Sequence, residues 1–185
     1  MDAKLKQQLA NLSAEDGQAR YDALEYVLAA SNAPVDWAYA VWDGLVAQMG
    51  ADTIHKRAIA TTLLCNLAKS DPEARILKAL PAIVAVTHDK SFITARHTIQ
   101  ALWKIGAAGK RQQKAVLAAM EKRFADAAQD KQTTLIRYDL LVGMKQLYDA
   151  VRDESIPALA EALIATEPDA KYVKKYQTVW KRKRK

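Results

Sequence analysis

The sequence has few of the residues that build disulfide scaffolds or turn-rich sheets. It contains one cysteine, six glycines and five prolines among 185 residues. A single cysteine, Cys65, excludes a disulfide within the chain and favours a reducing compartment. Because glycine and proline are scarce while Ala, Leu, Lys, Gln and Glu dominate, the composition favours helix over strand at most positions.

Long apolar runs are also missing. The longest obvious one, 80–86, is too short to cross a bilayer, and the first twelve residues, MDAKLKQQLANL, lack the apolar stretch of a signal peptide. We therefore expect a soluble, cytoplasmic protein without membrane insertion.

The charge is unevenly distributed. The net charge is +7, but the last fifteen residues, KYVKKYQTVWKRKRK, hold eight of the 28 basic residues and no acid. Residues 1–170 thus carry 20 basic and 21 acidic groups. The sequence predicts an electrically balanced body and a cationic tail.

Apolar residues recur at helical spacing between short turns. Ile59, Leu63 and Leu67 are one example, and no period-two pattern is evident. Turn signals such as Ser70-Asp71-Pro72 divide the chain into about ten expected helices. Short turns between helices of this length favour antiparallel pairs stacked side by side.

Four arginines recur near the starts of expected helices. Arg20, Arg57, Arg96 and Arg137 are separated by 37, 39 and 41 residues, and Arg20-Tyr21-Asp22 is repeated as Arg137-Tyr138-Asp139. Near-regular spacing of this length is typical of helical repeat arrays. It predicts units at about 1–31, 35–69, 72–106 and 110–150, then helices near 154–166 and 168–180.

The third unit resembles a HEAT repeat of the armadillo/HEAT class. It has Asp71-Pro72 in its first turn, His88-Asp89 between its helices, and Ala101-Leu102 followed by Ile105-Gly106 at its end. At the level of pattern, residues 1–150 resemble small bacterial HEAT-repeat proteins. The resemblance implies an all-α, right-handed α-solenoid of about four helix pairs with C-terminal capping helices, as a single domain over residues 1–180 and a basic tail over 181–185.

The resemblance also implies roles for the arginines. In HEAT families, helix arginines and turn aspartates form a ladder between repeats, which would place Arg57, Arg96 and Arg137 beside Asp52, Asp89 or Asp130. A guanidinium can bond a carboxylate and helix-end carbonyls together, so such groups would hold successive units in register. The alternative is that these arginines, Arg20 among them, contact a bound partner.

No motif for a cofactor or a reaction stands out. The segment 106–111, GAAGKR, lacks the glycine spacing, the Ser or Thr and the preceding strand of a phosphate loop. His55, His88 and His97 show no metal-ligand spacing, and Cys65 lies in an apolar run. We expect no catalytic, metal or cofactor site.

Base excision is one enzymatic alternative, because some HEAT-like proteins remove alkylated DNA bases with aromatic residues and an acid. The matching residue types are Trp37, Trp42, Trp103, Asp43, Asp139 and Arg137. Their spacing does not reproduce that family's pattern, and the chain is short for the class.

The C-terminal segment predicts a basic amphipathic helix. Tyr172, Tyr176, Val179 and Trp180 share one face and could dock on the last repeat. Basic groups here and in the helix after Gly109 could bind phosphates, with strong salt dependence and little sequence discrimination. The candidate phosphate-binding residues are Lys110, Arg111, Lys114, Lys181, Arg182, Lys183, Arg184 and Lys185.

Repeat architecture without a reactive group favours a non-enzymatic adaptor. We expect a concave surface, lined by the second helices of the units, to bind a protein partner. Nucleic-acid binding through the basic helix and tail is the alternative. The oligomeric state is not determined by the sequence.

Overall fold

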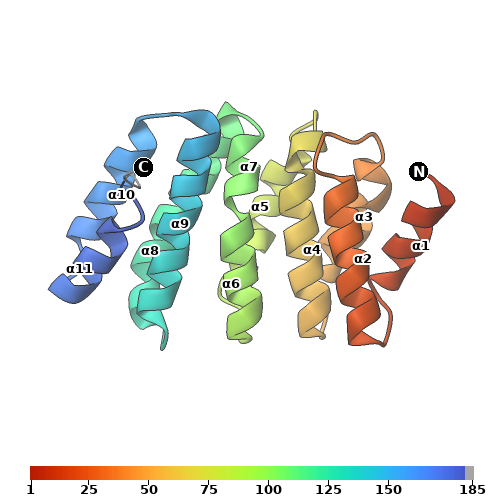
Figure 1. The fold of residues 1–185 in the computed structure, drawn as a ribbon, viewed down its shortest axis with the longest axis horizontal. Coiled ribbons are helices and arrows are strands. Elements are labelled where there is room, and N and C mark those ends of the chain that lie inside the picture. Colours follow the sequence, from red (N-terminus) through yellow and green to blue (C-terminus); the bar gives the residue numbers. More distant parts are fainter. Residues whose placement is uncertain (182–185) are drawn as a thin grey trace. The chain divides into compact units, whose positions relative to one another are not determined.

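The computed structural model describes residues 1–181 and confirms the all-α prediction, because every regular element in that range is helical (Figure 1). The chain divides into two compact units, Met1–Thr98 and Ile99–Lys185, which we describe separately. None of the helices in the described range is long and apolar enough to cross a membrane.

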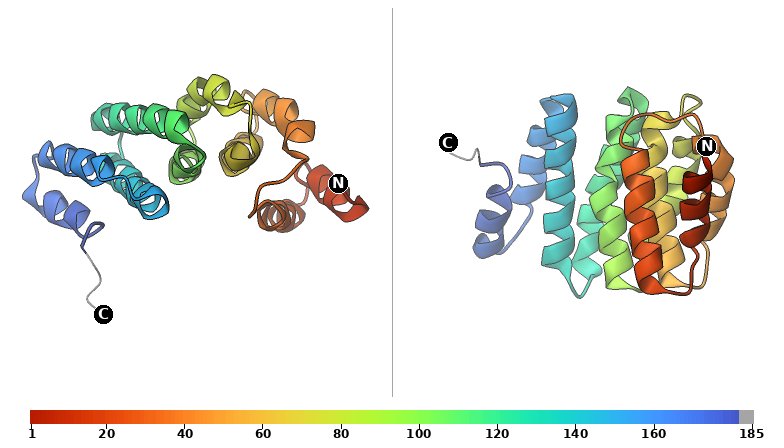
Figure 2. Two further views of the ribbon diagram at one scale, coloured as in Figure 1. Left: turned by 90° about the horizontal axis from the view of Figure 1, so that it is seen from above. Right: turned by 45° about the vertical axis from the view of Figure 1, so that its right-hand side comes forward.

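The first unit consists of three helix pairs. Their bounds are α1 Ala3–Asn11, α2 Gly17–Ala30, α3 Ala38–Gln48, α4 Ile54–Leu67, α5 Arg75–Val86 and α6 Phe92–Ala101, with a short 3-10 turn at Ala68–Ser70 after α4. Seen from above in Figure 2, α1, α3 and α5 form one layer and α2, α4 and α6 the other. The first two pairs coincide with the units predicted at 1–31 and 35–69, whereas the third predicted unit, 72–106, extends beyond α6 into the next helix, Trp103–Ala107.

Local capping explains where several of these helices begin. The Asp2 carboxylate accepts a hydrogen bond from the Leu5 backbone N–H at 2.7 Å, and Asp16 accepts one from Ala19 at 2.6 Å. Each satisfies one of the backbone donors that a helix start leaves without a partner. Asp2 and Asp16 therefore act as the N-caps of α1 and α2.

Apolar side chains from both layers meet in the core of the first unit. Leu63 and Leu64 of α4, Ile76 and Ile83 of α5, and Val27 of α2 have no solvent exposure. Each such side chain contributes about 1.5–3 kcal/mol by leaving water. The helix pairs are held together by this shared apolar interior.

Buried polar side chains link successive second helices. The Asn66 side-chain amide on α4 donates to the Ser31 hydroxyl at the end of α2 at 2.7 Å, and Thr61 and Thr98 share a hydrogen bond of 2.9 Å between α4 and α6. All four side chains are buried. Because a buried polar group without a partner is costly, these bonds fix one register between neighbours.

The second unit contains the remaining helices: α7 Trp103–Ala107, α8 Lys110–Asp126, α9 Thr133–Val151, α10 Ser155–Ala165 and α11 Ala170–Gln177. Helix α7 packs against α8 and α9, and α10 packs against α9. A side chain at Gly106 would place its Cβ 2.8 Å from the Leu147 side chain. Glycine at this position therefore lets α7 and α9 approach closely.

Helix α11 closes the second unit, as the amphipathic pattern predicts. Tyr176 is fully buried, its ring meets Phe124 of α8 edge to face at 6.4 Å, and its hydroxyl donates to the Thr134 carbonyl at 3.3 Å. Burial raises the pKa of Tyr176 to about 12. This single aromatic residue anchors the helix, since most other side chains of α11 are exposed or half-buried.

We expect Tyr176→Ala to release α11, because truncating a buried aromatic side chain costs about 3–5 kcal/mol. Amide exchange over 170–177 should accelerate and the denaturant midpoint should fall. Lys174→Ala, an exposed change on the same helix, is the matched control. Equal exchange rates in the two variants would contradict this anchoring role.

Candidate functional site

A groove crosses the second helices of all three pairs in the first unit and has a volume of about 280 Å³. Because α2, α4 and α6 form one layer (Figure 2), the groove runs over side chains from three separate parts of the sequence. It is lined by Gly17, Arg20, Tyr21 and Leu24, by Ile54, His55, Ala58, Ile59 and Thr62, and by Ser91, Ile93, Thr94 and His97. We call it the second-helix groove.

The rim of the second-helix groove is unusually apolar. Within residues 1–181 four large hydrophobic side chains are exposed: Met1, Tyr21 at 59%, Ile54 at 49% and Ile93 at 66%. Three of these four line the groove. Single exposed hydrophobic residues are common on protein surfaces, whereas a contiguous group of them marks a surface that another molecule covers.

Within residues 1–181, the titratable side chains that line the groove include no acid. Arg20, His55 and His97 contribute to its surface, and no Asp or Glu does so among the described residues. The pKa of His55 is lowered, first by its burial and then by the positive charges of Arg20 and Lys56. The groove therefore combines apolar contact surface with the positive charge of Arg20.

Other hollows in the described residues lack this combination. A larger one of about 460 Å³ in the second unit is lined by Trp180 and residues of α10 and α11, and it includes Glu161. Another in the first unit, of about 410 Å³, lies beside Trp42 and Asp43. Neither contains an exposed large hydrophobic residue, so the second-helix groove is the stronger candidate.

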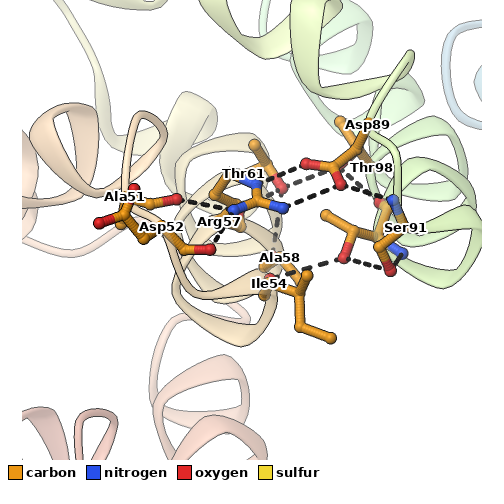
Figure 3. Close-up of polar contacts among 10 residues, drawn as sticks. Ala51, Asp52, Ile54, Arg57, Ala58, Thr61, Asp89, Ser91 and Thr98 are labelled. Carbon is orange, nitrogen blue, oxygen red and sulfur yellow. Dashed lines mark hydrogen bonds and ion pairs between the residues drawn. The ribbon is translucent and has the colours of Figure 1, made fainter.

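Arg57 joins the turn before α4 to the turn before α6 (Figure 3). Its Nη1 donates to the carbonyls of Ala51 and Asp52 at 2.7 and 2.9 Å, while Nε and Nη2 donate to the two carboxylate oxygens of Asp89 at 2.5 and 2.9 Å. The Asp89 carboxylate also accepts from the Ser91 backbone N–H at 2.8 Å, before the start of α6. One ion pair therefore holds the turn before α4 and the turn before α6 together.

The electrostatic effect of this pair is reciprocal. The Arg57 guanidinium lowers the pKa of Asp89, and Asp89 raises the pKa of Arg57. The two side chains are only 10% and 6% exposed, so water screens them weakly. Two parallel hydrogen bonds add geometric specificity to the charge attraction.

Arg20 is anchored in the same way as Arg57. Its Nη1 donates to the carbonyls of Ala14 and Glu15, each at 2.6 Å, which are the residues six and five positions earlier in both cases. No carboxylate of residues 1–181 lies within ion-pair distance of Arg20. Asp52, which corresponds to Asp89 in spacing, is exposed and lies near Arg57 instead.

Arg137 and Asp130 have partners that the ladder prediction does not include. Arg137 donates to Glu167 at 2.8 Å and to the Phe124 carbonyl at 3.3 Å. Asp130 pairs with the buried Arg123 at 2.7 Å, and the Arg96 guanidinium lies 5.6 Å from the centre of the Phe92 ring. Glu167 has no counterpart in the aspartate pattern of the sequence, so only the structure identifies it.

The predicted phosphate-binding residues of the described chain lie at its surface. Lys110 pairs with Asp153 at 3.0 Å, whereas Arg111 and Lys114 are exposed. Lys181 is exposed as well. Four further candidates lie outside the described residues: Arg182, Lys183, Arg184 and Lys185.

The residues named for base excision are largely used in packing. Trp37 and Trp42 are 8% and 2% exposed, and Asp139 is 4% exposed. Arg137 is engaged by Glu167. Asp43 is exposed on α3. Within residues 1–181 no three metal-ligating side chains gather into a possible ion site.

Comparison with known structures identifies the fold. An engineered protein from the Northeast Structural Genomics Consortium matches with a TM-score of 0.54 and 18% identity, over 97% of this chain and 79% of its own. A designed armadillo repeat protein, solved in complex with the peptide (KR)4, matches with a TM-score of 0.49 and 16% identity, over 96% and 88%.

No protein-family model and no curated protein matches the sequence. With its stacked helix pairs, the chain has an armadillo/HEAT-like repeat fold and is an α-solenoid. The armadillo/HEAT-like fold that the sequence predicts is thereby confirmed. At 18% and 16% sequence identity, the similarity to these two structures concerns the fold and not the function.

Replacing Asp89 with Asn should destabilise the protein at neutral pH by about 1.5–3 kcal/mol, the range for hydrogen bonds to charged groups. The Asp89 pKa is lower in the folded than in the unfolded protein. The stabilisation by the pair is therefore present above about pH 4, the pKa of an unperturbed Asp, and is lost as pH falls through the folded pKa.

Urea denaturation of wild type and Asp89→Asn between pH 7 and pH 3 tests this dependence. The difference in the free energy of unfolding should narrow as the pH falls. Asp36→Asn, at an exposed position, should differ little from wild type throughout. A difference that stays constant with pH would count against the ion pair as its source.

Arg20→Gln should raise the pKa of His55, because it removes one of the positive charges that disfavour the imidazolium. Titration of the His55 ring by NMR measures the shift. Lys114→Gln, which changes the net charge equally in the second unit, should leave the His55 pKa in place. An unchanged value in Arg20→Gln would show that the guanidinium does not face the groove.

Proposed function

We propose that this protein is a non-enzymatic binding protein and that the second-helix groove receives a segment of a protein partner. The observation that carries the proposal is the concentration of Tyr21, Ile54 and Ile93 along one groove. Covering these side chains would remove apolar surface from water, which is the main favourable term in protein association.

The size and form of the groove support a protein segment as its occupant. Its volume of about 280 Å³ lies just below the range of about 300–1,000 Å³ that is typical of small-molecule pockets. Three of its apolar side chains, Tyr21, Ile54 and Ile93, are 59%, 49% and 66% exposed. A segment that lies along the three helices can cover them, as in other cases where one peptide occupies a groove between helices.

The repeat architecture gives the groove a rigid base. Arg57 with Asp89, and Thr61 with Thr98, join α4 to the turn before α6 and to α6 itself. A binding surface that is already ordered loses less conformational entropy when a partner binds. We also propose a cytoplasmic location, because the one cysteine of the sequence, Cys65, can form no disulfide within the chain, as is typical of proteins in a reducing compartment.

Removing the apolar rim should abolish partner capture. In affinity purification from cell extract, the double variant Tyr21→Ser with Ile93→Ser should lose the proteins that wild type retains, whereas Ala82→Ser with Ala85→Ser, at exposed positions on α5, should retain them. Circular dichroism should show equal helix content. Retention of the same proteins by the rim variant, or recovery of nucleic acid with no protein, would contradict the proposal.

A further inference from the structure

Arg20 and Arg57 share one kind of backbone anchor in the first unit, and the described residues supply a carboxylate partner to Arg57 but not to Arg20. Arg57 uses Nη1 for two backbone carbonyls and presents Nε and Nη2 to the carboxylate of Asp89. Arg20 uses Nη1 for the two equivalent carbonyls. No carboxylate in residues 1–181 occupies the place that Asp89 takes on Arg57.

The side chain of Arg20 is held in place without neutralisation of its charge. Two hydrogen bonds of 2.6 Å fix the guanidinium, which is half-buried and lines the second-helix groove. A positioned guanidinium with one donor edge open matches the two oxygens of a carboxylate. Since the side chain is already ordered, a ligand that binds it loses little additional entropy.

The surroundings of Arg20 favour an anion that is attached to an apolar body. Arg20 supplies the positive charge of the groove, while its exposed rim consists of Tyr21, Ile54 and Ile93. A free anion would leave this apolar rim uncovered, and an uncharged apolar segment would leave the guanidinium partly desolvated without a partner. The complementary ligand carries both features.

We propose that the groove selects an acidic amphipathic segment of the partner protein, in which an Asp or Glu carboxylate bonds Nε and Nη2 of Arg20 while neighbouring apolar side chains cover Tyr21, Ile54 and Ile93. This inference rests on the proposed function. The partner's carboxylate then plays the part on Arg20 that Asp89 plays on Arg57. Charge complementarity excludes the chain's own basic C-terminal residues as the occupant.

Selection from a phage-displayed library of random 12-residue peptides on the full chain tests the inference. The selected peptides should be enriched in Asp or Glu next to aliphatic or aromatic residues. Arg20→Gln should weaken their binding about tenfold to a hundredfold, the effect of losing a charge-assisted hydrogen-bond pair. Arg20→Lys should weaken it less, since it retains the charge but not the planar fork.

Controls separate this inference from the proposed function. Arg111→Gln makes the same charge change at an exposed position on α8 and should leave binding intact. Selected peptides that are neutral or basic, and whose binding is lost in Ile93→Ser but kept in Arg20→Gln, would overturn the inference and leave the groove as a binding site. Failure to select any peptide, or binding that ignores both variants, would contradict both proposals.

A nucleic-acid occupant would also be detected. A labelled single-stranded oligonucleotide of twelve nucleotides should not compete with the selected peptides at physiological salt, because it offers phosphates without apolar side chains at matching positions. Competition that depends on Arg20 would overturn the choice of an acidic protein segment.

Discussion

A short helix pair cannot bury its apolar face alone, and the rest of this structure depends on that constraint. Each pair in the first unit is stable only because side chains such as Leu63 and Ile83 share one interior with its neighbours. Burial is not directional, so it does not by itself determine how one pair is set against the next. Directional polar bonds between the second helices supply that register, with Arg57 and Asp89 as the best-defined example (Figure 3).

The same constraint connects structure to binding. Stacking commits the first helices and the inward faces of the second helices to the core, which leaves one side of α2, α4 and α6 available to a ligand. Exposed side chains on this side do not pack in the core, and yet three of them, Tyr21, Ile54 and Ile93, are apolar. Arg20, in the first repeat, is anchored to backbone carbonyls but pairs with no carboxylate of the described chain. Arg57, one repeat later, has the same anchor and pairs with Asp89. In our proposal, the anchor that holds the repeat together at Arg57 serves to bind a partner's carboxylate at Arg20.

Much of the fold could be predicted from particular residues. The apolar spacing of Ile59, Leu63 and Leu67 predicts α4, and Asp16 and Asp169 mark the starts of α2 and α11, because helix periodicity and capping are local properties. The aromatic face of the last helix likewise identified Tyr176 as a contact residue. The candidate site was less predictable. On a helix, Ile93 has the same spacing to its neighbours as a core residue, so periodicity does not reveal that it is 66% exposed.

The sequence alone determined the helical class, the repeat period and most helix boundaries, since these depend on residues within a few turns of each other. Only the tertiary structure decided which arginine meets which acid. Arg57 lies 32 residues from Asp89, Arg137 bonds Glu167 rather than an aspartate, and Arg20 meets no carboxylate in the described chain. Such pairings depend on how three helices pack against one another, and the exposure of each side chain is set by neighbours that are distant in sequence.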